Sequence, residues 1–300
     1  MPFLELALTI RAADQERVEH ALEEVGALAV TLQDADADTP DEQAILEPGA
    51  GETPLWDAVA LTALFEADRD RAGLVQVLTE LVPDLAPDQV EFREVADQDW
   101  TRVWMDRFRP MRFGRRLWIY PSNVEPPGDD ADAVVVRLDP GLAFGTGTHP
   151  TTALCLEWLD AADLGGRTLV DYGCGSGVLA IAALKLGAAR AVGVDNDPQA
   201  LLSSRDNAER NGVAARLDLY APDAFAPPAP ADALVANILA GPLTELAPRF
   251  AACMKPGAPL ALSGILDGQQ HELAERYGRW FDELAVAMRD GWVRIDGVRR

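Results

Sequence analysis

The stretch Thr168–Ala180, TLVDYGCGSGVLA, decides the fold of the chain. A short apolar run leads into Asp171, glycines follow at Gly173, Gly175 and Gly177, and a helix-forming apolar run comes next. A strand, a glycine turn and a helix in this order form a nucleotide-binding crevice, because glycine permits positive φ and the helix N-terminus presents unpaired N–H groups. The alternative is an ordinary turn that binds no ligand.

The spacing of the glycines indicates which nucleotide is bound. In a dinucleotide fingerprint the third glycine comes three residues after the second, and that position is Val178 here. The pattern G-x-G-x-G resembles class I S-adenosylmethionine (SAM) methyltransferases instead, and an NAD oxidoreductase is disfavoured. Asp195 ends a second apolar run 22 residues after Gly173, where a carboxylate can hold both ribose hydroxyls.

Composition limits the classes of partner. The formal net charge of −23 repels phosphate backbones, so we expect no direct nucleic-acid binding, whereas a basic protein would be attracted. The same acidity could reflect the salt tolerance or genome composition of the source. The length of 300 residues and the 48% hydrophobic content favour two domains with packed cores.

Four features favour a cytoplasmic protein without a metal centre. No run of 18 apolar residues is found, and the N-terminal MPFLELALTI lacks the positive charge of a signal peptide. The cysteines at 155, 174 and 253 form no C-x-x-C pair, and the three histidines are scattered. We therefore expect no membrane association, no metal site and a monomer.

Residues 1–96 alternate in the order β-α-β-β-α-β, which is the split ferredoxin-like arrangement. The region contains no catalytic constellation and is typical of a recognition module. The expected strands are 3–10, 28–33, 56–66 and 90–95, and the expected helices begin at Asp14, as a cap, and at Asp70.

Residues 97–110 form an expected linker helix ended by Pro110. Trp100, Trp104 and Phe108 recur at four-residue spacing on one face, which we interpret as a packing face within a connector between domains. The catalytic domain then spans residues 111–300.

Residues 138–152, LDPGLAFGTGTHPTT, are too rich in glycine for a regular element. Such a segment just before a nucleotide-binding strand could close over a ligand, and a long tight loop is the alternative. Thr151 or Thr152, after Pro150, is the expected start of a helix over residues 153–159.

Strands and helices continue to alternate beyond Asp195, and the chain then changes pattern. Asp290-Gly291 separates two apolar runs, which predicts an antiparallel hairpin. A doubly wound α/β sheet that ends in a hairpin is the class I methyltransferase topology. Asp223, after the third expected strand, could reach an adenine amino group or be a solvated loop carboxylate.

Asn237 ends the fourth expected strand, and ligands in open α/β sheets bind at the carboxyl ends of the strands. Methyl transfer to an amine needs an unprotonated nitrogen aligned with the methyl group, and an amide carbonyl in apolar surroundings can align it. We assign Asn237 as the catalytic residue; the alternative is an asparagine that caps the next helix.

Together these segments resemble the bacterial ribosomal protein L-eleven methyltransferase family, over nearly the whole chain. The resemblance implies SAM-dependent methylation of lysine ε-amino groups and of the N-terminal α-amine of one large-subunit ribosomal protein. The resemblance implies that Thr152, Gly173, Asp195 and Asn237 contact the cofactor. We expect Gly175, Gly177 and Asp223 to contact it as well. The motifs are GETPLW, DQDWTRVWMDRFRPMRFG, LDPGLAFGTGTHPTT, DYGCGSGVLAIAALKLGA, DNDPQAL, RDNAERNG and VANILAGPL.

Two further functions stay open beside this one. The chain could methylate another protein or a small amine, or it could be a SAM-binding regulatory module without turnover. Asn237 followed by Ile238-Leu239 argues against the regulatory module.

Overall fold

The computed structural model describes residues 2–37, 39, 54–82, 85–95, 109–126, 132–139, 149–225 and 229–300. The chain divides into two compact units, residues 1–99 and 100–300. The expected linker helix 97–110 and the centre of the glycine-rich segment 138–152 fall mostly outside the described residues.

The first unit has the predicted element order. Its strands are antiparallel and lie in the order β2-β3-β1-β4. Alternate residues of β1 and β3 are buried, because successive side chains of a strand point to opposite faces, and they pack with α1 and α2. The elements are β1 (Phe3–Arg11), α1 (Gln15–Glu24), β2 (Ala29–Asp34), β3 (Ala58–Glu66), α2 (Arg71–Leu81) and β4 (Glu91–Val95).

The start of α1 differs from the sequence prediction in one detail. Asp14 occupies the N-cap position, but its carboxylate makes no capping hydrogen bond. It forms ion pairs with Arg11 and Arg17 instead, at 3.0 and 2.5 Å. Asp70, in contrast, accepts from the Ala72 N–H and caps α2.

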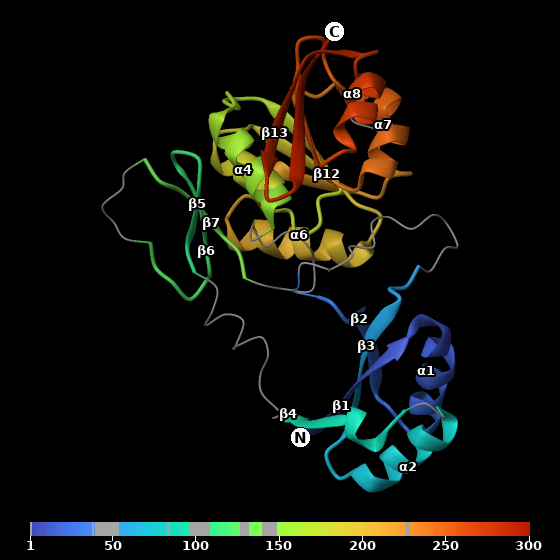
Figure 1. The fold of residues 1–300 in the computed structure, drawn as a ribbon. Coiled ribbons are helices and arrows are strands. Elements are labelled where there is room, and N and C mark those ends of the chain that lie inside the picture. The colour runs from blue at the N-terminus through green and yellow to red at the C-terminus, as the bar shows by residue number, and fades with distance from the viewer. Residues whose placement is uncertain are drawn as a thin grey trace. The chain divides into compact units, whose positions relative to one another are not determined.

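The second unit is built on a seven-stranded sheet in the order β10-β9-β8-β11-β12-β14-β13. The pairs from β10 to β12 are parallel, and β14 runs antiparallel to both β12 and β13. This is the predicted α/β fold with a terminal hairpin (Figure 1). The strands are β8 (Thr168–Tyr172), β9 (Arg190–Val194), β10 (Leu217–Tyr220), β11 (Ala233–Asn237), β12 (Pro259–Leu266), β13 (Phe281–Arg289) and β14 (Trp292–Arg299).

Helices cover both faces of this sheet. Leu169 of β8 packs with α4 and α5, and its neighbour Val170 packs with α7 and α8 on the opposite face. A burial of both faces is typical of parallel sheets, whose strands are apolar throughout. The helices are α4 (Pro150–Ala161), α5 (Val178–Lys185), α6 (Pro198–Arg210), α7 (Ala240–Cys253) and α8 (Gln270–Tyr277).

A three-stranded sheet extends the core beside α4 and α5. It consists of β5 (Met111–Phe113), β6 (Leu117–Tyr120) and β7 (Val134–Arg137), with β6 in the centre. The sequence predicted the last two strands, but β5 is too short to give a pattern. In the part of the chain that the structure describes, no helix could span a membrane and no group of three or more potential metal ligands occurs.

Candidate functional site

The predicted glycine turn follows β8 and ends at α5. Gly173, Gly175 and Gly177 all have positive φ, of 79, 52 and 78°, a region that side chains strongly disfavour. A Cβ on Gly173 would lie 2.1 Å from Cγ2 of Ile238, so the turn closely approaches the segment after β11. Gly177 is the N-cap of α5 and provides no side-chain cap. The first turn of α5 therefore has no cap from its N-cap residue, and the Asp171 carboxylate accepts from its Ala180 N–H instead.

Asp195 lies beside this turn at the end of β9. One carboxylate oxygen accepts from the Gly175 N–H at 2.8 Å, and the other accepts from the Asp197 N–H at 3.0 Å. Each oxygen keeps a further lone pair for another donor. The carboxylate is thus fixed by backbone groups and can still accept from a pair of hydroxyls.

Asp171 is fully buried beneath the turn. One of its oxygens accepts from the Ala180 N–H at 3.0 Å, and the other has no hydrogen-bond partner among the described residues. Burial raises the pKa of this carboxyl to about 7, because the charged form is poorly solvated.

Cys174 occupies the centre of the glycine turn and is also buried. Its Sγ lies 3.5 Å from the Ser204 hydroxyl of α6. Burial raises the pKa of the thiol, so the sulfur is protonated at neutral pH and takes no part as a nucleophile.

Asn237 ends β11, as predicted, and meets a residue of α4. Its Nδ2 lies 3.3 Å from Oγ1 of Thr152, whose side chain is completely buried. The hydroxyl accepts from the amide nitrogen, which leaves the Asn237 carbonyl oxygen for another donor. Thr152 and Asn237 are 85 positions apart in the sequence and were predicted to share one site. The fold brings their side chains into contact.

A cavity of about 310 Å³ adjoins Asn237. It is lined chiefly by apolar side chains with a few polar groups, which is typical of small-ligand sites. The lining residues are His149, Thr151, Asn237, Ile238, Leu239, Gly264 and Trp292.

His149 fixes one wall of this cavity and was missed by the sequence analysis. Helix α4 begins at Pro150, earlier than predicted, and the His149 Nδ1 accepts from the Thr151 N–H at 3.3 Å as its N-cap. The imidazole packs edge-on against Trp292 with ring centroids 4.7 Å apart. Burial lowers the pKa of His149, which keeps the ring neutral and able to accept. Pro150 could have indicated this helix start, because proline is common at the first position of a helix.

Trp292 was missed because its position depends on the sheet order. It is the first residue of β14 and pairs with Leu266 of β12 and Arg289 of β13. The predicted hairpin did not indicate which face of the sheet the indole would cover. On β12, Gly264 has φ 86° and leaves only 2.3 Å between an added Cβ and the Ile238 carbonyl oxygen, so a side chain there would displace the cavity floor.

Asp223 is a predicted cofactor contact that the structure leaves untested. It is exposed in the turn after β10. No hydrogen bond or ion pair joins it to the other predicted site residues in the described part of the chain. Its role toward an adenine group stays a prediction.

Comparison with known proteins agrees with this geometry. Residues 2–300 match the family described as ribosomal protein L11 methyltransferase (PrmA). The chain belongs to the ribosomal protein L11 methyltransferase family. Over the full length of both chains it is 58% identical to the ribosomal protein L11 methyltransferase of Stenotrophomonas maltophilia (strain K279a) and 56% identical to that of Xanthomonas euvesicatoria pv. vesicatoria (strain 85-10).

A crystal structure of a ribosomal protein L11 methylase from Lactobacillus delbrueckii subsp. bulgaricus is also similar. Its TM-score is 0.58 with 29% sequence identity, and the match covers 64% of this chain and all of that one. The L11 methyltransferase family and the sheet order confirm the predicted class I methyltransferase fold.

The residues present fit SAM on three grounds that this structure supplies. The three glycines of the turn carry no side chains that would keep a ligand from their backbone. Asp195 offers a fixed carboxylate suited to a ribose diol. The apolar cavity begins at Asn237 and Ile238, and Ile238 also closes against Gly173.

Proposed function

We propose that the cavity beside Asn237 receives an amino group of ribosomal protein L11 and that the glycine turn holds SAM as the methyl donor. Family membership gives the reaction, a SAM-dependent methyl transfer to L11. The finer proposal is that lysine ε-amino groups and the N-terminal α-amine are the acceptors. The observation that carries it is the Asn237 amide, held by Thr152 at the junction of turn and cavity.

Asn237 aligns the acceptor in this proposal. When bound, SAM supplies an electrophilic methyl group on a positively charged sulfur. The Asn237 carbonyl oxygen accepts an N–H of the amine and thereby directs the nitrogen lone pair, while Thr152 keeps the amide from rotating. Alignment of two reactants in this way supplies much of the rate enhancement of a displacement reaction.

The cavity walls favour the reactive form of the amine. Ile238, Leu239 and Trp292 provide an apolar lining, and such surroundings lower the pKa of an amine by disfavouring the ammonium ion. The nitrogen must lose its proton before transfer, and the neutral His149 imidazole adds no positive charge beside it.

We further propose that the domains expected from the sequence have separate roles. Residues 1–96 recognise the protein substrate, residues 97–110 link the domains, and residues 111–300 carry out catalysis. The net charge of −23 supports a basic protein as the partner rather than nucleic acid. A cytoplasmic monomer is the corresponding proposal for location and assembly.

A methylation assay tests the function. The purified chain is incubated with SAM and either L11, free lysine or an unrelated basic protein, and the products are mapped by mass spectrometry. We expect methyl groups on lysines and the α-amine of L11 only. Equal methylation of free lysine or the unrelated protein would favour the broader amine methyltransferase, and SAM binding without turnover would favour a regulatory module.

A further inference from the structure

Helix α6 has a buried polar face that the proposed reaction does not use. Ser204, Asn207 and Asn211, which follows the helix as its C-cap, are 0, 7 and 9% exposed and are spaced three and four residues apart. That spacing places them on one side of the helix. A helix that only needed to pack would bury apolar side chains there, because buried polar groups are costly unless they are hydrogen-bonded.

Two of these side chains hold the carbonyl groups of the glycine turn. The Ser204 hydroxyl donates to the Gly175 carbonyl and the Asn207 amide donates to the Ser176 carbonyl, each at 2.9 Å. A trans peptide places its N–H opposite its C=O, so these bonds turn the next two N–H groups away from α6. The N–H of Gly177, for example, bonds to the Cys174 carbonyl at 2.7 Å. The hydrogen bonds from Ser204 and Asn207 thereby fix the two peptide planes that contain the Gly175 and Ser176 carbonyls.

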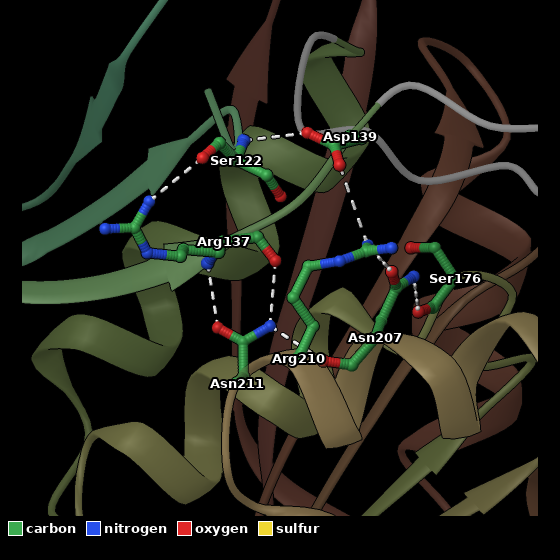
Figure 2. Close-up of polar contacts among 7 residues, drawn as sticks. All are labelled: Ser122, Arg137, Asp139, Ser176, Asn207, Arg210 and Asn211. Atoms are coloured by element: carbon green, nitrogen blue, oxygen red, sulfur yellow. Dashed lines mark hydrogen bonds and ion pairs between the residues drawn. The ribbon is translucent and has the colours of Figure 1, made fainter. Parts of the chain in front are cut away.

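The orientation of the Asn207 amide is itself determined by a neighbour. Its Oδ1 accepts from Arg210 at 2.8 Å, and a guanidinium can only donate. The amide nitrogen must therefore face Ser176. Figure 2 shows the resulting chain of contacts, in which Arg210 also lies 3.9 Å from the Asp139 carboxylate.

The same helix holds the end of β7. The Asn211 side chain accepts from the Arg137 N–H and donates to the Arg137 carbonyl, both at 2.8 Å, as a neighbouring strand would (Figure 2). Asp139 is held from the other side, because its Oδ1 accepts from the Ser122 N–H at 2.7 Å. One helix thus anchors both the glycine turn and the segment 137–139.

We propose that Asn207 is a positioning residue for the cofactor. It holds the Ser176 carbonyl on α6 and so keeps the glycine turn in the one conformation that presents its backbone to SAM. The inference rests on the proposed function, since it assumes that SAM binds at this turn. Asn207 itself acts only through the Ser176 peptide.

Calorimetric titration with SAM, without L11, tests this inference on Asn207→Asp. The substitution keeps the shape but replaces the donating NH2 by an oxygen that repels the Ser176 carbonyl. We expect about tenfold weaker SAM binding, the effect of losing one buried hydrogen bond. In turnover assays the KM for SAM should rise by a similar factor, whereas kcat at saturating SAM and the KM for L11 stay within about twofold, a split that a general loss of structure would not produce.

Asp206→Asn is the matched control, because it makes the opposite exchange at the adjacent exposed position of α6 and should leave SAM affinity unchanged. Arg210→Ala is the second variant, which releases the Asn207 amide without replacing it. We expect about threefold weaker binding from it.

The outcomes separate the two proposals. A wild-type chain that does not bind SAM overturns the proposed function and this inference with it. A wild-type chain that binds SAM while Asn207→Asp binds equally well overturns the inference alone. A joint loss of kcat and rise of both KM values also overturns it. If Asn207→Asp does not fold, unchanged affinity in Arg210→Ala decides against the inference.

Discussion

The two halves of the proposed site, one for the cofactor and one for the amine, differ in whether backbone or side chains form them. The cofactor half consists mainly of backbone: three glycines with positive φ and a helix, α5, whose N-cap Gly177 has no side chain, with the Asp195 carboxylate as its polar side chain. The amine half consists of side chains: α4 is capped by His149, and the cavity is bounded by Asn237 and Trp292. A site formed by backbone groups requires small residues at particular positions in the sequence. A site formed by side chains requires that residues far apart in the sequence come into contact.

The difference predicts distinct responses to mutation. Changes on the backbone half should alter cofactor affinity, and changes on the side-chain half should alter turnover or its pH dependence. The first two of the following variants test whether the two halves can be separated in this way, and the last two test the titrating group that lies in each half.

The largest effect is expected from Gly173→Ala. The new Cβ would lie 2.1 Å from Ile238 Cγ2 at a φ of 79°, so the turn or its neighbour must move. We expect SAM affinity to fall at least about 100-fold, from the clash and from backbone strain together. Gly166→Ala is the control, because it has a similar φ of 71° with no atom within 4 Å. Calorimetry that finds equal affinities in both variants would contradict the backbone half of the comparison.

Asn237→Ala should act on turnover instead. The amine loses the carbonyl that aligns it, so kcat is expected to fall about 100-fold while the Kd for SAM stays within about tenfold. Thr152→Val, which removes only the hydroxyl that orients the amide, should give a smaller loss of kcat. Steady-state kinetics with L11 provide the measurement, and unchanged turnover in Asn237→Ala would remove its assigned role.

Acidic pH should affect the amine half. Burial lowers the pKa of His149 in the folded chain below its ordinary value of 6.5, and only the neutral ring can accept the Thr151 N–H. The unfolded chain therefore binds this proton more readily, and stability falls as the pH decreases from 6.5 through the lowered pKa. His149→Asn keeps a capping acceptor that does not titrate, so its Tm should decrease less over this interval than that of the wild type. Parallel Tm curves would show that His149 does not cap α4.

A rise from acidic to neutral pH should affect the stability of the cofactor half. Asp171 has a pKa of about 7 in the folded chain and an ordinary value of 3.8 when unfolded. Its contribution to stability therefore declines as the pH rises from about 4 to 7 and stays low above that. Asp171→Asn retains an acceptor for the Ala180 N–H and cannot ionise. We expect its stability advantage over the wild type to be about 2–3 kcal/mol larger at pH 8 than at pH 5. Denaturant titrations at both pH values that give equal differences would contradict a raised pKa.

The sequence was more informative about the backbone half. Gly173, Gly175 and Gly177 are visible as a pattern because their conformation is a local property of the chain. The hairpin is local in the same way: Asp290-Gly291 has φ of 50 and 75°, which is the turn that this dipeptide favours.

The side-chain half could be predicted only where a strand end marked it. Asn237 was found because it ends a strand, whereas Trp292 needed the position of β14 between β12 and β13. The polar face of α6 was also missed, since the carbonyls that Asn207 and Asn211 bond lie more than 30 and 70 residues away in the sequence. The periodicity of apolar residues does not indicate hydrogen bonds between side chains and distant backbone groups.

Cys174 gives the glycine turn a chemical property of its own. Its thiol is enclosed next to Ser204 and Gly193, and burial raises its pKa, so little reactive thiolate forms at neutral pH. A thiol-directed reagent can modify this sulfur only when the turn opens. The rate of labelling at Cys174 is therefore a direct reading of how often the chain releases the conformation on which its backbone site depends.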